Sequence, residues 1–129
     1  PCKLAALDRA ALPCLASGNV YTKGTQPLAC DAGALAQPEF APNVQLAERT
    51  DGWYVTLSAG ARWRGEAKGR LATTASLGRA HVTGCAYESP DGTPLAIDAD
   101  YFGSRRDGLG PMPGPFETVG DGTSTFKVW

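Results

Sequence analysis

Hydrophobic and polar residues alternate most clearly in the middle of the chain, over residues 43–59. A period of two is typical of a half-buried β-strand, and the dipeptide Asp51–Gly52 is typical of a tight hairpin turn. The pattern therefore predicts a β-hairpin over 43–59. Within its second strand, Trp53 begins the face that we expect to pack in the core, whereas Tyr54 begins the outward face.

Shorter alternating stretches predict further strands at 79–87, 95–99 and 123–129. Near the N-terminus, Leu and Ala recur at helical spacing over residues 4–12, and Pro13 ends the run. The predicted fold is therefore all-β, a compact sandwich-like or irregular β-domain with a short N-terminal helix. We find no repeat of fixed period that would predict a solenoid.

Length, composition and charge narrow this prediction. The 129 residues are expected to form a single domain over residues 1–129, and the 16 glycines and 10 prolines indicate many short elements joined by turns. The formal net charge is −1, without a concentrated run of basic residues, so we expect no nucleic-acid partner. No apolar run approaches the ~20 residues of a membrane span, so we expect no membrane partner either.

The four cysteines, at positions 2, 14, 30 and 85, are unevenly spaced and include no Cys-x-x-Cys pair. This spacing favours disulfides over a metal site, so we predict two disulfides and a secreted or extracellular location. Reduced, buried thiols are the alternative. If residues 4–12 are helical, Cys2 and Cys14 lie too far apart to bond each other.

Aromatic residues beside arginines are the candidates for sugar binding, because sugar rings stack on Trp and Tyr while Arg donates to hydroxyls. Trp63 lies between two arginines in a polar stretch bounded by glycines, so we predict that its ring is at least partly exposed. The candidate binding residues are Trp63, Tyr54, Arg62, Arg64, Tyr101 and Arg105. The alternative is that the large aromatics fill a small core, as we expect of Trp53.

Carboxylates are concentrated near the predicted strand at 95–99. Asp98 and Asp100 are two residues apart, which places both side chains on one face of a strand. Together with Asp107 they are a weak candidate for a calcium site, because calcium prefers several oxygen ligands. Paired carboxylates can also act as acid and base in glycoside hydrolysis, but we favour a structural role here.

Residues 98–117 contain an Asp, a Gly and two Arg, followed by Gly-Pro-Phe-Glu at 114–117. This segment resembles the closing segment of secreted right-handed parallel β-helix proteins of the pectate-lyase-like kind. The resemblance implies that the chain is a terminal module beside a β-helix, and that its Asp and Arg brace the closing loop. The pairs that we predict join Arg105 or Arg106 to Asp98, Asp100 or Glu117. No catalytic residue is implied.

These observations favour a non-catalytic accessory or glycan-contacting β-module of a secreted, polysaccharide-directed protein. Its partner would be a polysaccharide or an adjacent β-helix domain, and no cofactor is expected unless calcium binds. Two alternatives stay open, namely a fragment of a polysaccharide-active β-helix enzyme (hydrolase or lyase) and a disulfide-stabilised secreted interaction protein. An enzyme requires carboxylates with perturbed pKa values in a cleft. A binding module requires exposed aromatic residues, and an interaction protein requires a large apolar patch.

Overall fold

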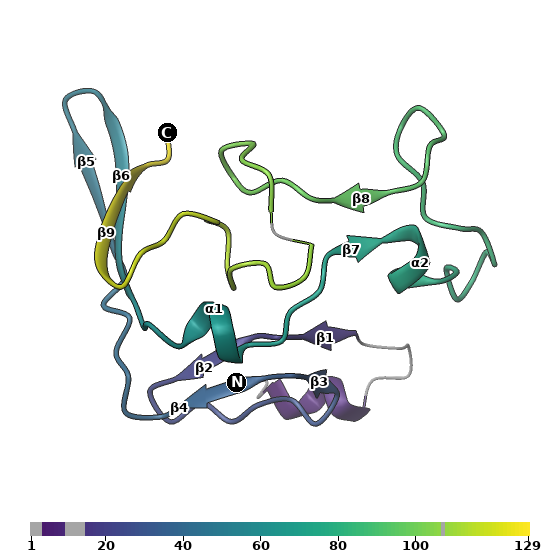
Figure 1. Ribbon diagram of the computed structural model, residues 1–129, viewed down its shortest axis with the longest axis horizontal. Helices are drawn as coiled ribbons and strands as arrows, with labels where there is room; N and C mark the ends of the chain where they lie inside the picture. Colours follow the sequence, from purple (N-terminus) through teal and green to yellow (C-terminus); the bar gives the residue numbers. More distant parts are fainter. Residues whose placement is uncertain (1–3, 10–14, 107) are drawn as a thin grey trace.

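The computed structural model of the protein describes residues 4–9, 15–106 and 108–129. Short strands dominate and the helices are few and short, so the predicted all-β fold is confirmed (Figure 1). The strands are β1 (Ala16–Ser17), β2 (Val20–Thr22), β3 (Asp31–Ala32), β4 (Leu35–Gln37), β5 (Gln45–Arg49), β6 (Gly52–Ala59), β7 (Ala72–Thr73), β8 (Ala96–Ile97) and β9 (Gly122–Lys127). The helices are the 3-10 helix η1 (Leu4–Arg9) and the single turns α1 (Trp63–Glu66) and α2 (Thr74–Leu77).

The N-terminal part forms a parallel stack of two chain turns. Strand β1 pairs with β3 and strand β2 pairs with β4, and in both pairs the partner residue lies fifteen positions further along the chain. Two successive turns of the chain therefore lie in register, as the coils of a solenoid do. No repeat is visible in the sequence here, because strands of two or three residues are too short to produce a period.

Glycine is required where this stack turns. Gly18 and Gly33 occupy equivalent corners of the two turns, and both have positive φ angles, +64° and +77°. A Cβ atom on Gly18 would lie 2.0 Å from the backbone nitrogen of Gly69, and one on Gly33 would lie 2.4 Å from Cβ of Lys68. The segment after α1 therefore packs directly on the glycine corners, which joins the stack to the rest of the fold.

The predicted hairpin over residues 43–59 is confirmed as strands β5 and β6, which β9 extends to a three-stranded antiparallel sheet. Val55 lies opposite Phe126 on the apolar face. On the other face, the hydroxyls of Thr56 and Thr125 are 2.8 Å apart in a cross-strand hydrogen bond. One side of this sheet is thus apolar and the other polar, as the alternating sequence predicts.

The remaining predicted elements have mixed outcomes. Strands β8 and β9 confirm the predictions at 95–99 and 123–129, although β8 has only two residues. The prediction over 79–87 is wrong, because this stretch forms a loop closed by one bridge between Arg79 and Ala86. The N-terminal helix is a 3-10 helix over Leu4–Arg9, and the rest of its predicted range lies outside the described residues.

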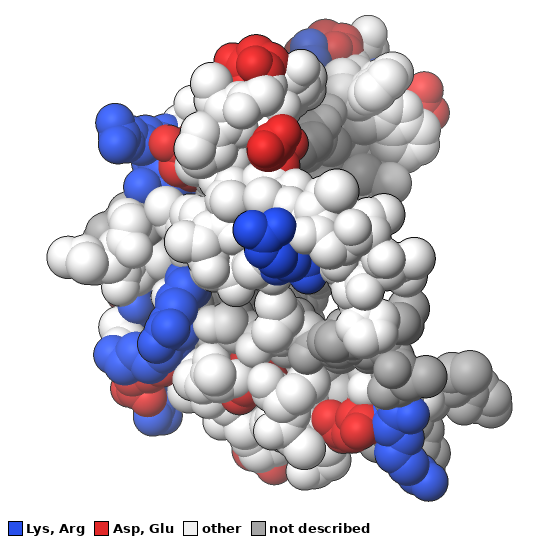
Figure 2. Space-filling view, turned by 90° about the vertical axis from the view of Figure 1, so that its right-hand side faces the viewer, with Lys and Arg blue, Asp and Glu red and all other residues white. Residues whose placement is uncertain are grey.

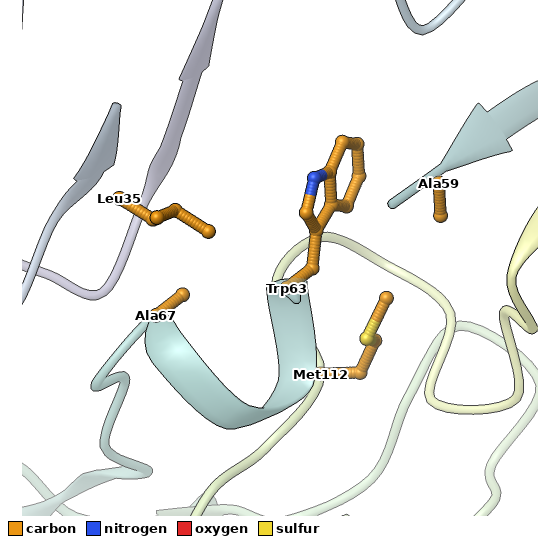
Figure 3. Packing of buried hydrophobic residues seen from close by; sticks show 5 residues of the cluster. All are labelled: Leu35, Ala59, Trp63, Ala67 and Met112. Atoms are coloured by element: carbon orange, nitrogen blue, oxygen red, sulfur yellow. The ribbon is translucent and has the colours of Figure 1, made fainter. Parts of the chain in front are cut away.

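A compact hydrophobic core lies between the parallel stack, α1 and the loop that precedes β9 (Figure 3). The buried residues of the core are Leu35, Ala59, Trp63, Ala67 and Met112. Ala59, Trp63 and Ala67 come from the end of β6 and from α1 with its C-cap residue, whereas Leu35 comes from β4 and Met112 from the loop before β9, so the core joins parts of the chain that are far apart in sequence. None of the helices in the described part of the chain is long and apolar enough to cross a membrane.

The prediction of two disulfides is wrong. Two bridges would need all four cysteines, whereas Cys85 has a free thiol, and no disulfide joins it to Cys30. Both of these cysteines are exposed. Cys2 and Cys14 lie outside the described residues. The secreted or extracellular location stays a prediction, which the described cysteines do not test.

Candidate functional site

Trp63, the residue predicted to form an exposed binding platform, belongs to the core. Its side chain is only 8% exposed, and the indole Nε1–H donates to Oε1 of Gln37 at 2.7 Å. The ring also meets Phe40 edge-on at a centroid distance of 5.4 Å. The prediction of an exposed ring is wrong because α1 turns Trp63 inward (Figure 3), while Arg62 and Arg64, on either side, remain exposed.

The other residues predicted near Trp63 lie in separate places. Arg62 forms an ion pair with Glu66 one helical turn later, and Arg64 reaches the loop before β9. Tyr54 lies on the polar face of the antiparallel sheet, where its hydroxyl donates to Asp51 at 2.8 Å. This hydrogen bond raises the pKa of the Tyr54 hydroxyl. The structure therefore does not bring Tyr54 and the arginines beside Trp63 into one site.

The segment 98–117 contains a charged cluster that includes one of the predicted pairs, Arg106 with Glu117, although the burial of its carboxylates was not predicted. Glu117 is 7% exposed and pairs with two arginines: Nη1 of Arg64 donates to Oε1 at 2.6 Å, and Nη1 of Arg106 forms an ion pair with Oε2 at 3.6 Å. Arg106 also donates to the backbone carbonyls of Met112 and Gly114, at 2.9 and 2.7 Å. The prediction that Arg105 or Arg106 braces this loop is confirmed for Arg106.

Asp100 holds the same loop from the other side. Its Oδ1 accepts from the backbone N–H groups of Phe102 and Ser104, and its Oδ2 accepts from that of Glu117, at 2.8–3.0 Å. The N–H of Glu117 contributes most to lowering the pKa of the Asp100 carboxyl, and the charge of Arg106 acts in the same direction. An ionised carboxylate with three backbone donors is a structural acceptor, not a proton donor for catalysis.

The calcium candidate gains no further ligands from the structure. Asp98 is half-buried, both oxygens of Asp100 accept backbone hydrogen bonds, and Asp107 lies outside the described residues. Among the described residues, no group of three or more His, Cys, Asp or Glu side chains could hold a metal ion.

An open cleft of about 450 Å³ lies beside this charged cluster. Its lining residues come from the segment around β7, from β8 and from the braced loop: Arg70, Leu71, Ala72, Ile97, Ala99, Asp100, Tyr101, Arg106, Pro111 and Pro115. Of the six predicted binding residues, only Tyr101 lines it. Arg105 is exposed and lies outside the cleft. Arg70 was not among the predicted binding residues, because the sequence shows it only as one of several charged residues in the same stretch.

The Tyr101 ring is held in place while much of its surface stays open. It is 55% exposed, its hydroxyl donates to the carbonyl of Val128, and its backbone N–H donates to Pro115 at 2.8 Å. Behind it the ring meets Phe116 and Phe102 edge-on, at centroid distances of 5.9 and 5.1 Å. These contacts give the cleft a fixed aromatic wall, which suits an apolar ring face of a ligand.

Arg70 supplies the cleft with a guanidinium that has no hydrogen bond or ion pair to any described residue. By contrast, the other arginine of the cleft, Arg106, is engaged by backbone carbonyls and Glu117. The cleft thus combines a fixed aromatic ring, aliphatic side chains such as Ile97, and one available cation. This combination can stack a small polar ring and donate hydrogen bonds to its substituents.

Comparison with known proteins identifies no family. No model of a protein family matches the chain, and no curated protein matches it. Among solved structures, the chain is similar to one described as the complex of XylC with xylose, with a TM-score of 0.75 and 26% sequence identity. The match covers 87% of this chain and 17% of that chain. The shared fold does not confirm the resemblance to pectate-lyase-like proteins.

Proposed function

We propose that this chain is a non-catalytic module that contacts glycan, in or beside a polysaccharide-directed protein. The observation that carries the proposal is the Tyr101 cleft, in which an exposed aromatic ring stands beside the available guanidinium of Arg70. The similarity to XylC, whose solved structure contains xylose, supports a sugar as the ligand. Because the chain spans 17% of that structure, the activity of a larger protein is not assigned to it.

Physical chemistry favours a sugar ring in this cleft. The C–H face of a sugar ring stacks on an aromatic face, and a guanidinium donates to two hydroxyls at once. The hydroxyl of Tyr101 is bonded to Val128 and its ring is supported by Phe116, so little ordering of the ring is needed on binding.

The carboxylates near the cleft favour binding over catalysis. Asp100 accepts three backbone hydrogen bonds, and Glu117 is shared by Arg64 and Arg106. A general acid needs a raised pKa and a reachable proton, whereas the pKa of Asp100 is lowered. Both carboxylates therefore stabilise the loop that carries Tyr101.

The test is affinity electrophoresis through gels that contain soluble xylan. We expect Tyr101→Ala to weaken retention by roughly tenfold, because one aromatic contact contributes on the order of 1–1.5 kcal/mol. Tyr87→Ala is the matched control, because Tyr87 is also exposed but does not line the cleft. Retention of Tyr101→Ala equal to that of the parent, in a protein whose fold is intact, would contradict the proposal.

A further inference from the structure

We infer that the glycan bound at the Tyr101 cleft carries an acidic group, which an adjoining basic cleft holds. The inference rests on the proposed glycan contact and adds the chemical class of the ligand. The second cleft has a volume of about 280 Å³ and is lined by three cationic side chains, Arg64, Lys68 and Arg70. Arg70 lines both clefts, so the available guanidinium stands where the two meet.

The charge of this region differs from that of the whole chain. Residues 62–70 hold four cations and one carboxylate, Glu66, although the formal net charge of the protein is −1. Glu66 pairs with Arg62, which does not line the cleft. Of the lining residues that the structure describes, none is an Asp or a Glu. On the face that Figure 2 presents, some Lys and Arg side chains stand alone and others lie beside Asp or Glu side chains.

The three cations differ in what they can offer to a ligand. Two donors of Arg64 are bound to Glu117, and Nζ of Lys68 donates to the carbonyl of Gly65 at 2.6 Å, so both are held in position. Arg70 retains its whole planar fork, which matches two oxygens of a carboxylate or a sulfate. The cleft therefore offers one bidentate donor between two fixed positive charges.

Glycines let a ligand come close to the backbone in this cleft. Gly33, Gly69 and Gly110 contribute to its lining, and none of them places a side chain over it. A neutral sugar ring on Tyr101 would place a substituent toward Arg70, at the junction of the two clefts. The ligand class is thus an oligosaccharide that carries a carboxylate or sulfate group.

The experiment is calorimetric titration of the intact chain with three probes: xylotriose, xylotriose that carries one glucuronic acid, and sulfated xylotriose. We expect at least one acidic probe to bind roughly tenfold more tightly than xylotriose at low salt, and this advantage to shrink at 0.5 M salt because the charges are partly exposed. The preferred acidic probe distinguishes a carboxylate ligand from a sulfate ligand.

Two variants separate this inference from the proposed function. Arg70→Gln should abolish the advantage of the acidic probe over xylotriose and should also weaken xylotriose itself, because Arg70 lines the Tyr101 cleft as well, whereas Arg105→Gln, at an exposed arginine outside both clefts, should leave both affinities intact. Equal affinity for acidic and neutral probes, or an advantage that survives Arg70→Gln, overturns the acidic ligand and leaves the glycan contact standing. Failure of all three probes to bind overturns both.

Discussion

Two stretches of this chain combine aromatic residues with arginines, but their side chains have opposite orientations. Around Trp63 the aromatic ring is buried and the arginines on either side are exposed. In the loop after β8, the Tyr101 ring is exposed while Arg106 is largely buried, with a side chain that is 13% exposed. Composition therefore does not decide which side chain of such a stretch faces solvent.

Backbone geometry decides it in both cases. One turn of α-helix at α1 directs Trp63 toward Gln37 and Phe40 in the core. In the other stretch, the Asp100 carboxylate accepts hydrogen bonds from backbone N–H groups of a tight turn, and Arg106 donates hydrogen bonds to backbone carbonyls of the loop. The buried Arg106 therefore lies inside this loop, and the Tyr101 ring packs at its surface against Phe102 and Phe116.

The largest expected effect comes from truncating the aromatic residue of each stretch. Trp63→Ala should lower the free energy of unfolding by roughly 3–5 kcal/mol, because it removes a core ring and leaves a cavity. Tyr101→Ala should cost about 1 kcal/mol or less, since the ring is mostly exposed. Chemical denaturation of both variants measures the difference, and equal losses would contradict the opposite placement of the two rings.

Substitutions of Arg105 and Arg106, two adjacent arginines, should give a smaller effect on stability but a more closely matched pair of variants. Arg106→Ala should lower the free energy of unfolding by roughly 3 kcal/mol, because it leaves the carbonyls of Met112 and Gly114 without this donor and removes a charge partner of the buried Glu117. Arg105→Ala should change it by less than about 0.5 kcal/mol, because that side chain is exposed. Thermal melts of the two variants test this, and a similar shift in both would show that the loop is not braced by Arg106.

The smallest expected effect is a pH dependence of protein stability that arises from the Asp100 carboxylate. Because folding lowers the pKa of Asp100, its contribution to stability is present above about pH 4 and is lost as the pH falls through the folded-state pKa. Asp100→Asn should therefore be less stable than the parent at pH 7, with the gap closing in acid. Melting temperatures measured from pH 7 to pH 2 check this, and a gap that is constant over the range would refute it.

The sequence was sufficient to predict those parts of the fold that depend on local patterns. The hairpin of β5 and β6 followed from alternation and from Asp51–Gly52, and the brace by Arg106 followed from opposite charges close together in the chain. The parallel stack was missed because its strands pair across fifteen residues and contain only two or three residues each. Nothing local reveals such pairing.

The candidate site was predicted only in part, for a related reason. Tyr101 was identified from its residue type, and its exposure agrees with that choice. Trp63 was misplaced because a four-residue helix has no visible period. Arg70 was missed because its position between two clefts depends on how the β7 segment packs against the braced loop, which no short pattern describes.

The central claim is that sugar contacts the Tyr101 cleft and not Trp63, and chemical-shift mapping during a titration with xylotriose tests it most directly. We predict that the backbone signals of Ile97, Ala99 and Tyr101 shift together, while the indole N–H of Trp63, bonded to Gln37 in the core, stays unchanged. A shift of the Trp63 indole without any at Tyr101 would contradict the account.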